Sequence, residues 1–335
     1  MAPVRNAKLI FNQFPSGLPE PGKTAIYDTS STIDLDAVDL NGSVLIKLLY
    51  ISVDPRIFPS SFVIGQPCRG FGIGKILRSE KEGFEKGDYV VSSEMDYSEY
   101  SIPKEYLQLL EKVIIEPGLS PSVYVGAAGM PGKTAYYPWK EYSKAQKGET
   151  VFVSTAAGPV GSFVVQLAKL EGLKVIASVG SDEKVEFVKS LGADVVFNYK
   201  TTDVQEVLAK EGPINIYWDN VSGSTLDAAL GNAAHHARFI CCGFAALWTN
   251  AGGAAPMKNL ANIVTRRITL TGFISTDLTD KWGKEFKDVV PKKLASGEIK
   301  YKEDRTVGME HTMEALVQVL MGKNNGKKII VVSED

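Results

Sequence analysis

The chain contains 335 residues, 44% of them hydrophobic, and its formal net charge is -2. This length favours two domains, each with a core of its own, and the near-neutral charge excludes a broad basic surface for nucleic acid or an anionic membrane. Its three cysteines, two of them adjacent, cannot make a disulfide framework, and the first residues lack the apolar core of a signal peptide. We therefore expect a soluble, cytoplasmic protein whose partner is a small molecule.

The first part of the chain predicts a β-rich domain. Between Ser43 and about Tyr100, short apolar segments alternate with Gly and Pro, which is typical of an antiparallel, partly barrel-like region. From about Ile299 the chain continues with a helical stretch and then the apolar segment KKIIVV, which needs a sheet to join. We expect residues 1–125, completed by residues 299–335, to form one domain.

Residues 126–298 have a different pattern, in which apolar strand-like segments alternate with helical ones. The series begins with TVFVST, GSFVVQLAKLEG and KVIASVG and ends with RITLTGFI. Such alternation predicts an α/β domain with a Rossmann-type, doubly wound parallel sheet. In this interpretation the three histidines, His235, His236 and His311, all lie in helices.

The stretch TAAGPVG lies between the first of these strands and the helix that follows. Gly158 frees the backbone for a tight turn, and Gly161 lets the helix approach the strand and a ligand closely. With Pro159 and Val160 they leave the first helix amides open to an anion. Because Ala156 replaces the first glycine of the fingerprint G-x-G-x-x-G, a plain structural turn is the alternative. At the head of a strand-helix-strand series, however, the turn predicts the pyrophosphate seat of a dinucleotide.

The end of the next strand distinguishes the two nicotinamide dinucleotides. An Asp or Glu about 20 residues after the glycines would hold a free ribose 2′-hydroxyl. The chain instead reads Ala-Ser-Val-Gly there, and its first carboxylate is Asp182 in the following helix. Lys184 and Tyr199 offer a cation and a hydroxyl to a 2′-phosphate, so we expect NADPH. The alternative for Lys184 is a solvated helix residue paired with Asp182 or Glu183.

Motifs spread over nearly the whole chain resemble those of one family. They include YISVDP, GMPGKTAYY, TAAGPVG, WDNVSG, CCGF and GKNNGK. Together they are similar to the zinc-independent medium-chain dehydrogenases/reductases of the leukotriene B4 dehydrogenase, or prostaglandin reductase, group, which includes double bond reductases and curcumin reductases. The resemblance implies a GroES-like first domain and NADPH-dependent reduction of the carbon-carbon double bond of α,β-unsaturated ketones and aldehydes.

The resemblance also implies which residues contact the cofactor. The phosphate loop is expected to consist of Gly158, Pro159, Val160 and Gly161, with Lys184 and Tyr199 facing the adenosine phosphate. The nicotinamide half is expected to contact Asn220, Cys242, Gly243, Trp248, Phe273, Ile274, Ser275 and Asn324.

Three of these residues have structural alternatives. Asn220 alternatively caps the turn before the helix near Ser224. Asn324 alternatively caps a helix C-terminus beside Gly326. Cys242 and the cysteine before it are alternatively small buried strand residues.

The sequence predicts no metal site. The zinc-dependent relatives of this family carry several Cys ligands and a His-Glu pair, whereas the first domain of this chain contains Cys68 alone. A tetrahedral zinc site needs three or four nitrogen or sulfur ligands. We therefore expect hydride chemistry without a Lewis-acid metal, which disfavours alcohol oxidation.

Two tyrosines that are common in the group are missing. Trp248 follows the CCGF element where many members have Tyr, and Arg56-Ile57 follows Asp54-Pro55 where many have Tyr-Met. Because negative charge develops on the carbonyl oxygen, a donor aimed at that oxygen lowers the barrier. We expect Tyr50 or Arg56, with the ribose hydroxyl, to polarise the carbonyl, Trp248 to shape the pocket, and solvent to supply the proton. The alternatives are strand core for Tyr50 and a plain surface residue for Arg56.

Two other functions stay open at this point. An NADPH quinone oxidoreductase of the same superfamily would use the same cofactor, and a catalytically weak NADPH-binding protein would share the fold without the activity. The resemblance further implies a homodimer, for which the segment RRITLTGF offers an edge strand.

Overall fold

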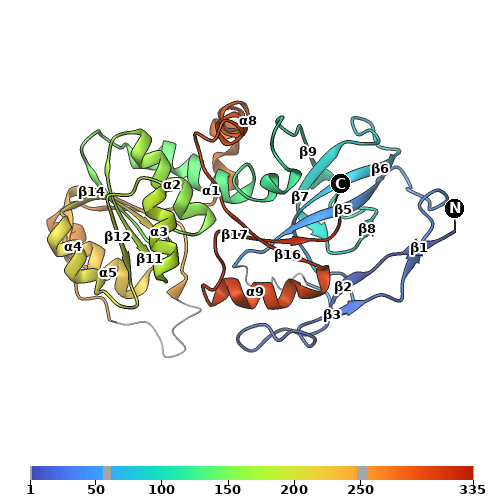
Figure 1. Ribbon diagram of the computed structural model, residues 1–335, viewed down its shortest axis with the longest axis horizontal. Coiled ribbons are helices and arrows are strands. Elements are labelled where there is room, and N and C mark those ends of the chain that lie inside the picture. Colours follow the sequence, from blue (N-terminus) through green and yellow to red (C-terminus); the bar gives the residue numbers. More distant parts are fainter. Residues whose placement is uncertain (1, 56–61, 247–255, 335) are drawn as a thin grey trace. The chain divides into compact units, whose positions relative to one another are not determined.

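The computed structural model describes residues 2–55, 62–246 and 256–334, which form two compact units (Figure 1). Unit 1 comprises Met1–Met130 and Glu303–Asp335, and unit 2 comprises Pro131–Lys302. Each unit has a large sheet of its own. Arg56 and Trp248, both expected at the site, lie outside the described residues.

Unit 1 is built on a seven-stranded sheet with the order β16-β17-β5-β6-β7-β9, in which β8 also pairs with β5. All neighbours are antiparallel except β16 and β17, which are parallel. The apolar segment near the end of the chain is strand β17, and it joins this sheet beside β5. The strands are β5 (Val44–Ser52), β6 (Arg69–Ser79), β7 (Tyr89–Asp96), β8 (Tyr100–Ser101), β9 (Glu111–Val113), β16 (Glu303–Val307) and β17 (Lys327–Val331).

Two short antiparallel pairs and a few helical segments complete unit 1. The pairs are β1 (Val4–Arg5) with β4 (Thr32–Ile33) and β2 (Lys8–Phe11) with β3 (Ala25–Asp28). The helical segments are η1 (Leu107–Leu109), η2 (Pro121–Val125), η5 (Met309–His311) and α9 (Thr312–Leu320). The core of the unit lies along β5, of whose nine residues all but Lys47 are buried.

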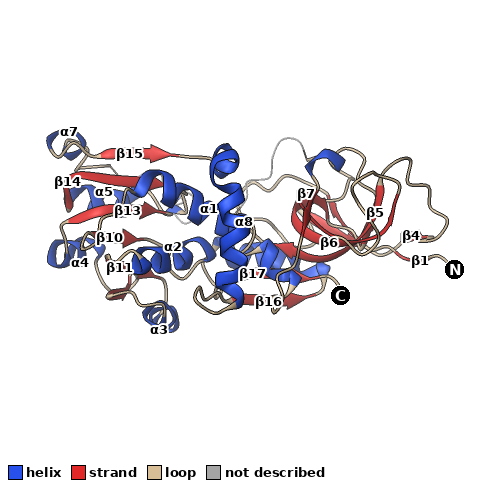
Figure 2. Cartoon of the chain, turned by 90° about the horizontal axis from the view of Figure 1, so that it is seen from above, coloured by secondary structure: helices blue, strands red, loops and turns tan. Residues whose placement is uncertain are grey.

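Unit 2 contains a six-stranded sheet in which every neighbouring pair is parallel, with the order β12-β11-β10-β13-β14-β15. In Figure 2 the labelled strands β15, β14, β13, β10 and β11 follow one another downward from β15 at the top. The chain starts at β10, builds outward to β12 and then returns to β13 on the other side of β10. The topological switch point therefore lies between β10 and β13, where ligands bind at the carboxyl ends of the strands.

The strands of unit 2 are β10 (Thr150–Val153), β11 (Lys174–Val179), β12 (Val195–Asn198), β13 (Ile214–Asp219), β14 (Ala233–Cys241) and β15 (Thr269–Gly272). The helical segments are α1 (Met130–Pro138), which begins at the end of unit 1, and η3 (Trp139–Ser143), α2 (Pro159–Leu170), α3 (Asp182–Ser190), α4 (Val204–Glu211), α5 (Gly223–Gly231), α7 (Asn262–Thr265), η4 (Ser275–Leu278) and α8 (Thr279–Ala295).

Aromatic rings form the centre of one core of unit 2. The ring of Phe152 on β10 stacks on that of Tyr217 at 5.0 Å, and Tyr217 meets Phe239 edge-on at 5.3 Å. Leu208 of α4 and Leu230 of α5 belong to the same buried cluster, so these two helices cover this face of the sheet. Such a face, buried beneath helices, explains why the strands are apolar throughout rather than alternating.

The predicted fold class is confirmed: the chain combines a parallel, doubly wound α/β sheet with a separate antiparallel β unit. The assignment to helices is wrong for His235 and His236 and correct for His311. His235 and His236 lie in strand β14, because α5 already ends at Gly231, and His311 lies in the short 3-10 segment η5. In the part of the chain that the structure describes, no helix is both long and apolar enough to cross a bilayer.

Candidate functional site

The turn between β10 and α2 leaves the start of a helix uncapped. Gly158 is the N-cap residue, Pro159 occupies the first helical position, and no side chain caps the helix. Proline gives up no useful amide there. The next amides, those of Val160 and Gly161, belong to the first turn, which has no intrahelical acceptors for them. They point out of the helix at its positive end, where a phosphate is stabilised.

Gly161 is required by close packing of the helix against the preceding turn. A Cβ atom at this position would lie 2.5 Å from the carbonyl oxygen of Thr155 and 2.8 Å from the Cα of Ala156. Thr155 itself has a positive φ of 53°, and the amide of Ala156 donates to the carbonyl of Ser178 on the neighbouring strand at 3.0 Å. The turn is thus held by β11 while its amides stay available for an anion.

Tyr199, one of the residues expected to face a phosphorylated ribose, lies beside the end of β11. A Cβ atom on Gly180 would lie 3.1 Å from the hydroxyl oxygen of Tyr199, so glycine leaves room for this half-exposed ring beside the turn. Lys184 is half-buried in the first turns of α3. The one carboxylate that could compete for the ribose, Asp182, accepts a hydrogen bond from Asn198 at 3.0 Å. The structure thereby brings Gly180 and Tyr199 together and ties Asp182 to β12.

At the switch point, Asn220 bonds to the end of β10. Its backbone amide donates to the hydroxyl of Ser154 at 3.0 Å, and its side-chain amide donates to the carbonyl of Ser154 at 2.7 Å. The indole of Trp218 donates to the Asn220 side-chain oxygen at 3.3 Å. Asn220 therefore does not cap the following turn. That role belongs to Asp219, whose carboxylate accepts the amides of Val221 and Ser222.

The segment after β14 is joined to the same place through its backbone. The amides of Cys242 and Gly243 donate to the carbonyl of Asp219 at 2.8 and 3.1 Å. Burial, and then the charge of Asp219, raise the pKa of Cys242 to about 12 and that of Cys241 to about 11. Both thiols are therefore protonated at neutral pH.

Residues 273–275 follow β15 at the same edge of the sheet. The ring of Phe273 lies 6.0 Å from that of Trp218, which connects this segment to the end of β13. Ile274 is 65% exposed, and Ser275 begins the 3-10 segment η4. The carboxyl ends of β10, β13, β14 and β15 thus bring together, within unit 2, most of the residues expected to contact the nicotinamide half.

In unit 1, Tyr50 is a core residue of β5. Its side chain is 2% exposed, its hydroxyl donates to Glu334 at 3.0 Å, and the Arg305 guanidinium lies 5.9 Å above its ring. Burial and the hydrogen bond to Glu334 raise the pKa of Tyr50. These contacts favour the strand-core alternative for Tyr50.

Asn324 lies in the loop before β17, and its side-chain amide donates to the carbonyl of Gly326 at 2.7 Å. The preceding helix, α9, is not capped by Asn324. Gly322, with a φ of 65°, ends it, and Lys323 donates its amide back to the carbonyl of Gln318 in the Schellman pattern. The helix-cap alternative for Asn324 is therefore wrong.

A buried ion pair lies next to this loop and was not anticipated from the sequence. The ammonium group of Lys327, 4% exposed, contacts the carboxylate of Asp54 at 2.7 Å and donates to the carbonyl of Val53. The hydroxyl of Ser52 donates to the same carboxylate at 2.6 Å. Burial lowers the pKa of Lys327, and Asp54 opposes that shift. The pair joins the start of β17 to the segment that leads into Pro55.

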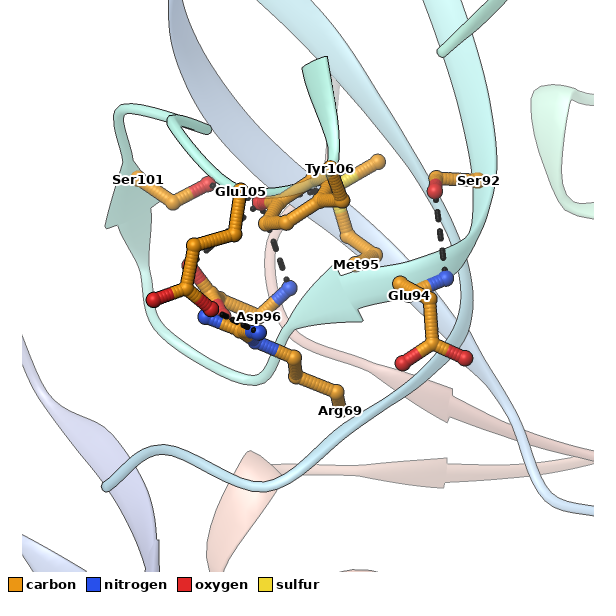
Figure 3. Close-up of polar contacts among 8 residues, drawn as sticks. All are labelled: Arg69, Ser92, Glu94, Met95, Asp96, Ser101, Glu105 and Tyr106. Carbon is orange, nitrogen blue, oxygen red and sulfur yellow. Dashed lines mark hydrogen bonds and ion pairs between the residues drawn. The ribbon is translucent and has the colours of Figure 1, made fainter. Parts of the chain in front are cut away.

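A second group of charges in unit 1 is satisfied internally (Figure 3). The guanidinium of Arg69 contacts Asp96 at 2.7 Å and Glu105 at 2.6 Å, and it lies 5.5 Å above the ring of Tyr106. The Tyr106 hydroxyl lies 3.4 Å from the Asp96 carboxylate. Burial raises the pKa of Asp96, because the nearby Arg69 offsets only part of the lost solvation. This cluster joins the start of β6 to the end of β7, and we assign it no ligand.

Sequence reasoning missed four buried polar residues, namely Ser154, Tyr217, Asp219 and Lys327. A usable signal was present for two of them: Asp219 directly follows the apolar run INIYW, and Lys327 begins the apolar run that ends the chain. A charged group in such a run must be paired or hydrogen-bonded when the strand is buried. In the described ranges, no group of three or more His, Cys, Asp or Glu side chains is placed to hold a metal ion.

Comparison with known proteins agrees with this geometry. A family model described as zinc-binding dehydrogenase matches residues 159–292. The chain is 36% identical to a 2-alkenal reductase (NADP(+)-dependent) of Nicotiana tabacum, with 99% of each chain covered, and 33% identical to (+)-pulegone reductase of Mentha piperita, with 99% of this chain and 100% of the relative covered. Its fold matches the crystal structure of CurA from Vibrio vulnificus in complex with NADPH, with a TM-score of 0.85, 28% identity, and 98% of this chain and 100% of the other covered.

Proposed function

Because this chain belongs to the medium-chain dehydrogenase/reductase family, in its group of alkenal and enone double bond reductases, we propose that it reduces the carbon-carbon double bond of α,β-unsaturated ketones or aldehydes. The Nicotiana tabacum relative is named as NADP(+)-dependent and the CurA structure is a complex with NADPH, and NADPH is the cofactor. The observation that carries the proposal is that no side chain caps the start of α2 and that position 161, packed against Thr155, has room only for glycine.

The residues of unit 2 fit this cofactor from one end to the other. The amides after Gly158 would hold the diphosphate at the positive end of α2. Tyr199 and Lys184 would contact the 2′-phosphate, and Asp182 does not compete because it is bonded to Asn198. Asn220, with the segments after β14 and β15, would hold the nicotinamide half.

When bound, the reduced nicotinamide supplies a hydride to the β carbon of the substrate. Negative charge then develops on the carbonyl oxygen, and a cation or hydrogen-bond donor directed at that oxygen lowers the barrier. We assign this role to Arg56 together with the ribose hydroxyl, and not to Tyr50, because the Tyr50 hydroxyl already donates to Glu334 in the core of unit 1. Trp248 shapes the substrate pocket, and solvent donates the proton to the α carbon.

One assay tests the reaction class. NADPH oxidation is measured with a panel of enones, enals and quinones, and products are analysed by mass spectrometry and NMR. We expect saturated ketones and aldehydes with the double bond reduced and the carbonyl intact. Turnover of quinones alone would assign a quinone oxidoreductase, and tight NADPH binding with no turnover across the panel would assign a binding protein.

Isotope labelling tests the direction of addition. We expect deuterium from labelled NADPH at the β carbon and deuterium from solvent at the α carbon. The reverse distribution of label would contradict hydride transfer to the β carbon.

A homodimer formed through β15 belongs to the same proposal. Within the described sheet, β15 is the strand at one end of the order, and three apolar side chains on or near it are exposed: Val264, Leu270 and Ile274. An edge strand of this kind can pair with its symmetry mate. Leu270→Lys should give a monomer in sedimentation velocity, whereas Leu18→Lys, at a similarly exposed position in unit 1, should not. A cytoplasmic location stays a prediction from cysteine usage.

A further inference from the structure

Asp219 is a buried carboxylate at the switch point of unit 2, one strand away from the phosphate turn. It ends β13 and is 1% exposed. Among the described residues no Lys or Arg forms an ion pair with it, so its charge depends on hydrogen bonds alone. A buried carboxylate without a cation is costly, and its retention here needs an explanation beyond simple packing.

Three donors meet at one oxygen of this carboxylate. The hydroxyl of Tyr217 donates to Oδ1 at 2.7 Å, and the amides of Val221 and Ser222 donate to the same atom at 2.9 and 2.7 Å. The Tyr217 hydroxyl also lies 3.2 Å from the hydroxyl of Ser154. The carboxylate therefore folds residues 219–222 into a tight turn and connects that turn to β10.

The turn needs such support because Ser222 has an unfavourable backbone conformation. Its φ is 65° and its ψ is -157°, a region that glycine occupies almost alone. The hydrogen bond from its amide to Oδ1 offsets this strain. Without the acceptor, the segment would relax toward a conformation that other residues prefer.

Two segments of the proposed nicotinamide site depend on this turn. Asn220 lies inside it, and the carbonyl of Asp219 accepts the amides of Cys242 and Gly243. The two segments are in close contact, since a Cβ on Gly243 would lie 3.2 Å from the carbonyl oxygen of Asn220. The 219–222 turn meets the end of β10 at Ser154, one residue before the phosphate turn. The phosphate turn itself bonds to Ser178 of β11 and within its own backbone. We therefore expect a change in the 219–222 turn to act mainly on the nicotinamide half of the cofactor.

We propose that Asp219 is a positioning residue that holds Asn220 and Cys242–Gly243 at the nicotinamide half of the cofactor by fixing the strained turn through Oδ1. The inference rests on the proposed function, because it presumes that NADPH binds in unit 2. The effect of Asp219 is specific: the residue sets the affinity for the nicotinamide half of the cofactor and leaves the affinity for the adenosine half unchanged.

The test compares two ligands on each variant by calorimetry. NADPH carries both halves, whereas 2′,5′-ADP carries the adenosine and its 2′-phosphate without the nicotinamide. Asp219→Ala should weaken NADPH binding by about tenfold to hundredfold, the usual effect of losing hydrogen bonds to a charged group, and change 2′,5′-ADP binding less than about twofold. Asp219→Asn, which keeps an oxygen at the Oδ1 position, should retain most of the NADPH affinity.

A rescue variant separates this role from a general effect on folding. Asp219→Ala combined with Ser222→Gly should regain part of the lost NADPH affinity, because glycine adopts the turn without the acceptor. If Asp219→Ala does not fold, Ser222→Val tests the turn from its other end and should also weaken NADPH selectively. The control is Asp96→Ala, which removes a partly buried carboxylate in unit 1 and should lower the melting temperature without separating the two ligands.

The outcomes are distinct. Equal losses for NADPH and 2′,5′-ADP, or no loss for either, in both Asp219→Ala and Ser222→Val would overturn the inference. Wild-type protein that binds neither ligand, or binds NADPH without reducing any enone or enal, would count against the proposed function instead, and it is measured before any variant.

Discussion

The Cα of Gly161 lies so close to the carbonyl oxygen of Thr155 that a Cβ atom would come within 2.5 Å of that oxygen. Gly161→Ala must therefore displace α2 from the turn before it. We expect a loss of about 1–3 kcal/mol in the free energy of unfolding, as for other overpacked sites, together with weaker NADPH binding. Urea denaturation and a fluorescence titration measure the two effects.

Gly158→Ala is the matched control for this change. Its φ of -73° suits any residue, and a Cβ there would lie 3.3 Å from the same oxygen. The free energy of unfolding should then change by less than about 1 kcal/mol. Equal destabilisation by the two alanines would contradict the close approach of α2 to Thr155.

Lys184 tests the choice of cofactor. Lys184→Ala should raise the dissociation constant for NADPH about tenfold, because a charge-assisted contact to the 2′-phosphate is lost, and leave that for NADH nearly unchanged. An unchanged Michaelis constant for NADPH would remove Lys184 from the site. Lys189→Ala, a change on the same helix at a residue paired with Glu186, is the control.

Because Ser222 has a strained backbone, we expect one substitution there to stabilise the protein, whereas most substitutions destabilise it. Ser222→Gly should raise the free energy of unfolding by about 1 kcal/mol or more, since the conformation at φ 65° costs serine roughly that amount. Ser224→Gly, two residues further along inside α5, should lower it by about 0.5–1 kcal/mol. Two changes of the same sign in urea denaturation would argue against strain in this turn.

The alternation of apolar segments was sufficient to predict the parallel sheet, because strands such as Phe152–Val153 and Ile216–Trp218 are buried on both faces and leave no polar face to mislead the interpretation. It failed at His235 and His236, where the helical pattern of the preceding residues runs into the strand without a Gly or Pro stop beyond Gly231. The local pattern of apolar residues predicts that a helix or strand exists more reliably than it predicts the residue at which that element ends.

The glycines of the phosphate turn could be predicted because a turn is a local structure. Asn220 shows why the rest could not. Turn chemistry offered a cap as the alternative role of Asn220, but its side chain bonds to Ser154, 66 residues earlier, and the neighbouring Asp219 takes the cap. The same holds for Lys327, whose partner Asp54 lies 273 residues away. Pairs this distant in sequence depend on the completed fold.

The Lys327–Asp54 pair provides a further test. Lys327→Met leaves the largely buried Asp54 carboxylate with the hydroxyl of Ser52 as its one remaining hydrogen-bond partner among the described side chains. We expect a loss of about 3–5 kcal/mol in the free energy of unfolding, the usual result of breaking a buried pair from one side. Lys327→Met combined with Asp54→Leu should recover much of this loss. Loss of stability in the double variant equal to the sum of the single ones would show that the two side chains do not interact.

The thiols of Cys241 and Cys242 should react slowly with iodoacetamide. With a pKa of about 11 for Cys241, roughly one molecule in a thousand is a thiolate at pH 8, and alkylation should rise about tenfold per pH unit. These pKa values exceed the value of about 8.5 for an unfolded cysteine. The free energy of unfolding should therefore fall as the pH rises from about 8.5 toward the pKa values of the folded protein. Asp219→Asn should lower the pKa values of both cysteines and speed their alkylation. Unchanged alkylation rates would show that the charge of Asp219 does not raise these pKa values.

The protonated state of these two thiols has a consequence for durability. Conjugated aldehydes and ketones add readily to thiolate sulfur, so a catalyst that gathers them risks being consumed by its own reactant. Here the sulfur atoms of Cys241 and Cys242, at the end of β14, are kept in the unreactive form by burial and by one neighbouring negative charge. The protonated state of these two thiols thereby protects the protein from covalent inactivation by its own substrate.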